Sequence, residues 1–234
     1  MNISVVSFDG DMTLWDFLKV MRHSLQHTLA ELQKHVPTLR ALKLTIDEMI
    51  AIRNQFAEEV KGKIWSLEEI RRSAFERTLE HVGHPDKDLA AHLNAIYLKH
   101  RFEDIELYSD VIPTFDVLAP HYKLGLLSNG NTYPERCGLE DRFAFVVFSQ
   151  DVQVEKPDPK IFEITAQRAG CELRQLLHVG DSLENDVAGA QNAGAQAVWL
   201  NREGVPNDTE TRPDYEIGSL TEIPTILGLD RRKL

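Results

Sequence analysis

The chain has 234 residues, of which 42% are hydrophobic and 27% are charged, so it is long and apolar enough to bury a sizeable core. Its net charge of −11 argues against nucleic acid or an anionic membrane as the main partner, but it allows a small anionic substrate. We expect a cytoplasmic location. The N-terminal apolar run is too short for a signal peptide, no segment is long enough to span a bilayer, and the two cysteines do not make a disulfide framework.

A short apolar run at residues 3–8 predicts a buried strand that ends in two aspartates, Asp9 and Asp11. Gly10 between them allows a close turn, so that both carboxylates can occupy one small volume. Carboxylates this close repel each other unless a cation or a shared proton lies between them. The pair favours a metal site, a substrate site or both, although an Asp-Gly turn with solvated side chains is the simpler interpretation of the isolated pattern.

A long segment with helical spacing of apolar residues follows this strand. Pro37 stops its first helix, and the sequences at 45–48 and 66–69 have the capping-box pattern of two further helix starts. Pro85 predicts the start of a fourth helix. Because the segment is far too long for a plain connection, we predict an all-helical domain at residues 16–104, inserted directly behind the first strand.

Strands and helices alternate in the rest of the chain. The predicted strands cover residues 123–127, 143–148, 176–179, 195–200 and 215–217. The predicted helices cover residues 113–122, 159–169, 183–193 and 222–227. This alternation implies a parallel sheet with helices on both faces, so we predict a Rossmann-like α/β core at residues 1–15 and 105–234.

Polar side chains follow four of the predicted strands, at the sheet edge where open parallel sheets bind their ligands. These residues are Asp9, Asp11, Ser128, Asn129, Lys156 and Asp181. Their coincidence at one edge favours a functional site over an isolated turn.

Lys156 stands just before a predicted helix start, in which Asp158 is the N-cap and Pro159 the first helical residue. Pro157 keeps Lys156 out of the helical conformation. A lysine and a helix N-terminus at the same edge suit an anionic ligand. Taken alone, a solvated lysine before a helix is the simpler interpretation.

Asp181 lies at the end of a predicted strand, and Asp186 follows about one helical turn later. Together with Asp9 and Asp11 they would give the oxygen-rich site that Mg2+ prefers. By itself, Asp181 fits equally well as a helix N-cap.

Four segments of the chain resemble, in order and spacing, the four motifs of the haloacid dehalogenase superfamily. These segments are Asp9-Gly10-Asp11-Met12-Thr13, Ser128-Asn129, Lys156-Pro157 and Gly180-Asp181 through Asp186. The resemblance covers almost the whole chain, and the helical insertion resembles the cap of the dehalogenase-like branch. One departure is Met12, where the superfamily usually has glycine.

The resemblance implies a catalytic role for Asp9 as the nucleophile that becomes an aspartyl phosphate. Asp11 would protonate the leaving oxygen and then activate water. It also implies that Ser128 and the Asn129 amide hold phosphate oxygens, while Lys156 offsets the charge crowded between the phosphate and Asp9.

The implied cofactor is Mg2+. Its ligands would be the Asp9 carboxylate, the Asp11 main-chain carbonyl and Asp181, with Asp186 either a further ligand or hydrogen-bonded to one.

We therefore predict a Mg2+-dependent phosphomonoester hydrolase that acts on a small phosphorylated metabolite. A 2-haloacid dehalogenase is an alternative, but those enzymes lack the second aspartate, since a carbon–halogen bond needs no proton on its leaving group; Asp11 therefore favours phosphate. A phosphomutase and a non-catalytic phosphate- or metal-binding module remain further alternatives.

Several other residues have competing interpretations. Trp15 and the segment at 61–65, with its lysines and tryptophan, are candidates for contact with a lid or a substrate, although an exposed charged loop explains that segment as well. His23 and His27 lie four residues apart on one helix, which we interpret as a solvated or packed pair because no carboxylate joins them at suitable spacing. His178 within a strand is expected to be a core or edge histidine.

Overall fold

The computed structural model describes residues 2–103 and 105–229. The chain divides into two compact units, one of Met1–Asp16 and Glu106–Leu234 and the other of Phe17–Ile105. In the described part of the chain, no helix has the length and apolar character needed to cross a membrane.

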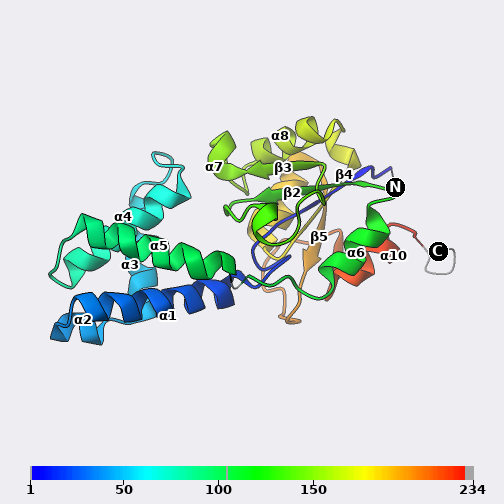
Figure 1. Ribbon diagram of the computed structural model, residues 1–234. Helices are drawn as coiled ribbons and strands as arrows, with labels where there is room; N and C mark the ends of the chain where they lie inside the picture. Colours follow the sequence, from blue (N-terminus) through cyan, green and yellow to red (C-terminus); the bar gives the residue numbers. More distant parts are fainter. Residues whose placement is uncertain (1, 104, 230–234) are drawn as a thin grey trace. The chain divides into compact units, whose positions relative to one another are not determined.

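The first unit is built on a six-stranded parallel sheet with the strand order β3-β2-β1-β4-β5-β6 (Figure 1). The strands are β1 Val5–Phe8, β2 Lys123–Ser128, β3 Phe145–Phe148, β4 Leu176–Gly180, β5 Gln196–Leu200 and β6 Tyr215–Ile217. β1 is fully buried and pairs with β2 and β4 on its two sides, as a central parallel strand should. The predicted parallel α/β fold is confirmed.

Helices cover both faces of this sheet. Val5 and Phe8 lie three positions apart in β1, so their side chains point to opposite faces of the sheet. Val5 belongs to one apolar core with Ile161 and Phe162 of α8, whereas the Phe8 ring lies 4.9 Å from the Phe115 ring of α6. The α-helices of this unit are α6 Val111–Leu118, α7 Ser149–Val152, α8 Pro159–Ala169, α9 Gly189–Ala193 and α10 Ile223–Ile226. Short 3₁₀ turns occur at Pro134–Arg136, Leu173–Gln175 and Leu220–Glu222.

Two helices differ from their predicted form. α6 begins at Val111, two residues before Pro113, because proline is tolerated within the first turn of a helix. The helix predicted at 183–193 is divided into a π-helical segment, Leu183–Ala188, and α9. A π-helical turn leaves no distinct mark in the pattern of apolar residues, and such turns often occur at functional sites.

The second unit consists of helices packed around their own apolar core. They are α1 Phe17–His35, α2 Leu39–Lys43, α3 Ile46–Glu59, α4 Leu67–His81 and α5 Lys87–Glu103. The capping box at the start of α3 is present, since Glu48 N donates to Thr45 Oγ1 at 3.2 Å and Thr45 N to Glu48 Oε2 at 2.8 Å.

Two helix starts in this unit were not predicted correctly. α2 follows Pro37 unexpectedly, and its N-cap is Thr38, whose hydroxyl accepts from Ala41 N at 3.2 Å. α5 begins after Asp86 rather than at Pro85, because the Asp86 carboxylate caps it by accepting from Leu89 N at 2.9 Å.

Candidate active site

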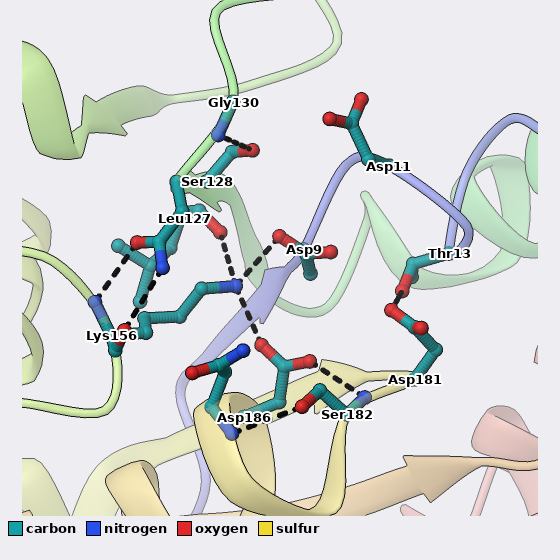
Figure 2. Close-up of polar contacts among 12 residues, drawn as sticks. Asp9, Asp11, Thr13, Leu127, Ser128, Gly130, Lys156, Asp181, Ser182 and Asp186 are labelled. Carbon is teal, nitrogen blue, oxygen red and sulfur yellow. Dashed lines mark hydrogen bonds and ion pairs between the residues drawn. The ribbon is translucent and has the colours of Figure 1, made fainter. Parts of the chain in front are cut away.

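The carboxyl ends of three neighbouring strands bring the predicted site residues together. Phe8 of β1 pairs with Leu126 of β2 and with Val179 of β4, so the chain leaves all three strands at one edge of the sheet. Figure 2 shows the side chains gathered at this edge, with the Lys156 amine at the centre and Asp11 on the far side of Asp9 from Asp186.

The Lys156 ammonium lies buried between two carboxylates. Its Nζ is 2.6 Å from Asp9 Oδ1 and 2.5 Å from Asp186 Oδ1, and it also donates to the Leu127 carbonyl at 3.2 Å (Figure 2). These contacts use all three donors of the ammonium. Burial opposes the charge, but the two carboxylates outweigh it and raise the pKa of Lys156 above its ordinary value. Lys156 therefore stays protonated.

The three carboxylates around this lysine carry more negative charge than it can neutralise. Burial, helped by Asp186 and Asp181, raises the pKa of Asp9 well above its usual range despite Lys156. Burial and Asp186 raise the pKa of Asp181 to about 6. Burial acts in the same direction on Asp186, but Lys156 and His178 hold its pKa below the ordinary value.

This charge imbalance suits a divalent cation. One oxygen from each of Asp9, Asp181 and Asp186 lies within 4.8 Å of the other two. Carboxylate oxygens are the donors that Mg2+ prefers, so the residues present fit the ion that the sequence predicts.

His178 fixes the orientation of Asp186. Its Nε2 lies 3.1 Å from Asp186 Oδ1, and its Nδ1 lies 2.8 Å from the Ser7 hydroxyl. Burial lowers the pKa of His178, so the neutral ring donates to Asp186 through Nε2 and accepts from Ser7 through Nδ1. Asp186 Oδ2 accepts from Ser182 N at 2.9 Å, which leaves neither carboxylate oxygen without a partner. His178 is a core residue as expected, but it also positions a site carboxylate.

The turn after β4 depends on Gly180. A Cβ atom at this position would lie 2.2 Å from Asp186 Cγ, because the Asp186 side chain folds back over the glycine. No larger residue fits while Asp186 keeps its contacts with Lys156 and Ser182.

The Asp11 carboxylate is held by an indole. Trp15 is 1% exposed, and its Nε1 donates to Asp11 Oδ1 at 2.7 Å. The turn that allows this contact is closed by a 2.8 Å hydrogen bond from Met12 N to the Trp15 carbonyl. Met12 adopts the left-handed conformation, with φ of 64°, where the superfamily usually has glycine. Trp15 orients Asp11, and its contact with a lid stays a prediction.

Asn129 ties the segment that carries Lys156 to the end of β2. Its side-chain Nδ2 donates to the Lys156 carbonyl, and its Oδ1 accepts from Lys156 N, both at 2.9 Å. Ser128, which is 2% exposed, accepts at its hydroxyl from Gly130 N at 3.0 Å. The side-chain amide of Asn129 therefore positions Lys156.

The ion pair of Arg202 with Asp110, which the sequence did not predict, supports the turn that carries Asp11. Arg202 donates to both oxygens of Asp110, at 2.8 and 3.0 Å, and to the Thr13 carbonyl at 2.8 Å. Although burial alone would raise the pKa of Asp110, the guanidinium and its hydrogen bonds hold it below the ordinary value. The Thr13 hydroxyl lies 3.4 Å from Asp181 Oδ1, so this turn also borders the carboxylate cluster.

Residues 6–200 match the haloacid dehalogenase-like hydrolase family. The chain belongs to this family. The resemblance inferred from the sequence motifs is confirmed.

Two curated relatives match over nearly their whole length. The chain is 27% identical to the 5-amino-6-(5-phospho-D-ribitylamino)uracil phosphatase YigB of Escherichia coli, covering 96% of each protein. It is also 27% identical to the human N-acylneuraminate-9-phosphatase, covering 96% of this chain and 94% of the relative.

A solved 2-haloacid dehalogenase from Pseudomonas syringae pv. Tomato DC3000 is 32% identical, with a TM-score of 0.83 over 97% of this chain and 98% of the dehalogenase. A solved haloacid dehalogenase-type phosphatase from Thermococcus onnurineus is 31% identical, with a TM-score of 0.68 over 98% of this chain and all of the other (100%). Overall similarity therefore does not separate the two chemistries.

We expect Gly180→Ala to destabilise the protein by about 1–3 kcal/mol, the usual cost of forcing an extra methyl group into a packed site. The matched control is Gly218→Ala, since a Cβ there would meet only Glu222 Oε1, at 3.9 Å. Urea unfolding of both variants measures the difference. Equal stability of the two variants would contradict the close approach of Asp186 to Gly180.

We expect the affinity for Mg2+ to fall as the pH is lowered through about 6, because Asp181, with its pKa raised to about 6, and Asp9, whose pKa burial also raises, must both lose their protons before they bind a cation. The Mg2+-induced shift in melting temperature, measured between about pH 5 and about pH 8, follows this change. Asp208→Asn, at an exposed aspartate, should leave the profile unchanged. A Mg2+ affinity independent of pH across this range would contradict the binding of Mg2+ by these carboxylates.

Proposed function

We propose that this chain is a Mg2+-dependent phosphomonoesterase that forms an aspartyl phosphate on Asp9. The observation that carries the proposal is the pair of carboxylates on one turn in opposite settings. Asp9 is buried beside the Lys156 ammonium, whereas Asp11 lies outside that cluster, held by Trp15. Two carboxyl groups in such different environments are suited to two roles, one as nucleophile and one as acid and base.

The proposed Mg2+ ligands are the Asp9 carboxylate, the main-chain carbonyl of Asp11 and the Asp181 carboxylate. Asp186 would remain beside the ion, because Lys156, His178 and Ser182 already engage both of its oxygens. When bound, Mg2+ would neutralise the charge that otherwise keeps an anionic phosphate away from Asp9.

The proposed reaction has two steps. Asp9 attacks phosphorus, and Asp11 gives its proton to the leaving alkoxide as the phosphorus–oxygen bond breaks. Asp11, now a carboxylate, takes a proton from water as that water attacks the phosphoryl group and frees Asp9. Lys156 stays protonated throughout and stabilises charge on the transferred group.

Phosphate oxygens would be held by the Ser128 hydroxyl and by the main-chain N–H of Asn129. The Asn129 side chain is already engaged with Lys156, so the main-chain amide is the group left for this contact. The same bonds fix Lys156, and Asn129 thus serves the site in two ways.

The substrate would be a small phosphate ester, as the names of the Escherichia coli and human phosphatases indicate for those two relatives, which are named for different phosphorylated metabolites. We propose that residues 16–104 form the cap that selects it, with residues 61–65 as the candidate contact segment. If the core contacts only the phosphate, the rest of the substrate must be recognised by another part of the chain.

The second candidate is a 2-haloacid dehalogenase, which the 32% identical Pseudomonas relative favours. Asp11 weighs against it. Dehalogenases of this superfamily lack the second aspartate, whereas here Asp11 is present and oriented by a buried tryptophan. A phosphomutase would use the same residues, and a non-catalytic binding module would not need an oriented acid.

We expect Asp9→Asn to abolish release of phosphate from phosphate monoesters, because the amide is a poor nucleophile of nearly the same shape. Asp11→Asn should slow turnover by about 10²–10⁴-fold, the usual span for a general acid–base group. The assay is a panel of phosphorylated metabolites with Mg2+, repeated with a chelator, which should stop the reaction.

Asp208→Asn is the control, as an exposed aspartate outside the site. Halide release from 2-chloropropionate without phosphatase activity would overturn the proposal in favour of dehalogenation. Full activity of Asp9→Asn would remove Asp9 from the mechanism.

A further inference from the structure

The helical unit carries an unusual concentration of histidines on two neighbouring helices. The chain has 9 histidines, and those that gather on α1 and α5 are His23, His27, His35, His92 and His100. They form two groups, in each of which one donor atom from each of three residues lies within 4.8 Å of the other two. The groups are His23, His27 and His100, and Glu31, His35 and His92.

The first group combines a pair on one helix with a partner from the other. His23 and His27 are four residues apart on α1, so they lie on the same face of the helix. The His27 and His100 rings are stacked with centroids 3.7 Å apart, and the His23 ring lies 4.7 Å from His27 and 5.9 Å from His100. His23 and His27 are exposed and His100 is half-buried, so the group is open to ions from solvent. His100 is the residue that the sequence alone did not bring to this pair.

We propose that His23, His27 and His100 bind one Zn2+ ion. Neutral imidazole nitrogens are preferred ligands of Zn2+, and a site with three of them leaves a fourth position for water. Two histidines four apart on a helix are a recurrent zinc-binding pair, and facing helices of a bundle commonly supply the remaining ligands.

The donor nitrogens lie close to the spacing that one ion needs, and the stacked His27 and His100 rings would rotate about their side-chain bonds so that a nitrogen of each points to the same ion. Zn–N bonds of about 2.0–2.1 Å place tetrahedral ligands about 3.3 Å apart. The donor nitrogens here already lie within 4.8 Å of one another. His100 also lies in the last turn of α5, where the helix dipole favours a cation.

The second group is less suited to a metal, because its carboxylate is already neutralised. Glu31 Oε1 is within 3.2 Å of His35 Nε2 and 3.1 Å of His92 Nε2, and Lys34 Nζ donates to Oε2 at 3.0 Å. The hydrogen bond from Lys34, followed by that from His92, lowers the pKa of Glu31 to about 2. A metal would have to enter beside the Lys34 ammonium, so we place the site at the first group alone.

The proposed ion would join α1 near its start to α5 near its end. His23 follows shortly after Phe17 and His100 precedes Ile105, the two residues at which the helical unit begins and ends. The ion would thus stabilise the folded unit by binding where its first and last helices meet. The proposed ligands are nitrogens, whereas the cluster of Asp9, Asp181 and Asp186 offers carboxylate oxygens. Zn2+ would therefore prefer the histidine site and Mg2+ the carboxylate site.

The test uses the full chain with the substitution Asp181→Asn and with excess Mg2+, so that the carboxylate cluster does not contribute to the measured Zn2+ binding. Calorimetric titration with Zn2+ should show one ion per chain, and Co2+ in its place should give the visible absorption of a tetrahedral nitrogen site. His27→Gln and His100→Gln, on different helices, should each weaken binding by at least about 10-fold, since even residues that only support a ligand commonly cost that much. The matched control is His84→Gln, at an exposed histidine outside both groups.

Affinity unchanged in His27→Gln or in His100→Gln would overturn the proposal, the latter because the site would then lie on α1 alone. Equal loss in His84→Gln would also overturn it, as would loss in His35→Gln, which belongs to the second group. Circular dichroism melting in a chelator shows that each variant is folded. None of these results bears on phosphate hydrolysis, which depends on other residues.

Discussion

The site depends on one buried ammonium that contacts two members, Asp9 and Asp186, of a cluster of three carboxylates. Lys156 neutralises part of a cluster that could not otherwise stay charged away from water, and removing one member of such a group leaves uncompensated buried charge. The surrounding structure keeps this lysine in place. Asn129 fixes its main chain, while His178 and the Ser182 amide hold Asp186 against its amine. We propose that the remaining negative charge lets the cluster bind a cation and, through the cation, an anionic substrate.

The sheet topology explains why these contacts are possible. Because β1 is central, the turn that carries Asp9 is flanked by the ends of β2 and β4, which supply Ser128 and Asp181. The same pairing sets Ser7 directly beside His178, so the hydrogen bond that orients Asp186 is a consequence of strand register. The Asp11 side chain lies outside the carboxylate cluster, because the turn brings it to the Trp15 indole. The two aspartates therefore differ in charge environment although they are two residues apart.

The sequence predicted the features that follow from strand ends and periodicity. Acids after a buried strand and the alternation of strands and helices led to the α/β fold and to the residues that the structure gathers. It did not reveal the roles of His178, Trp15 or Arg202. Their partners are set by strand pairing and by contacts such as Arg202 with Thr13, which are 189 positions apart. The π-helical turn that carries Asp186 was likewise invisible, because its apolar pattern is that of an α-helix.

The central claim is that water attacks phosphorus and leaves Asp9 with its own oxygens. In a dehalogenase, Asp9 would also form an ester. Water would then attack the carbonyl carbon of that ester and leave its own oxygen atom in the aspartate. A single turnover in heavy-oxygen water, followed by mass analysis of the released phosphate and of the peptide that contains Asp9, tells the two apart. Because Asp11 is present to assist an alkoxide and Lys156 faces the site as a cation, we predict labelled phosphate and unlabelled Asp9. Heavy oxygen in Asp9 would contradict the account.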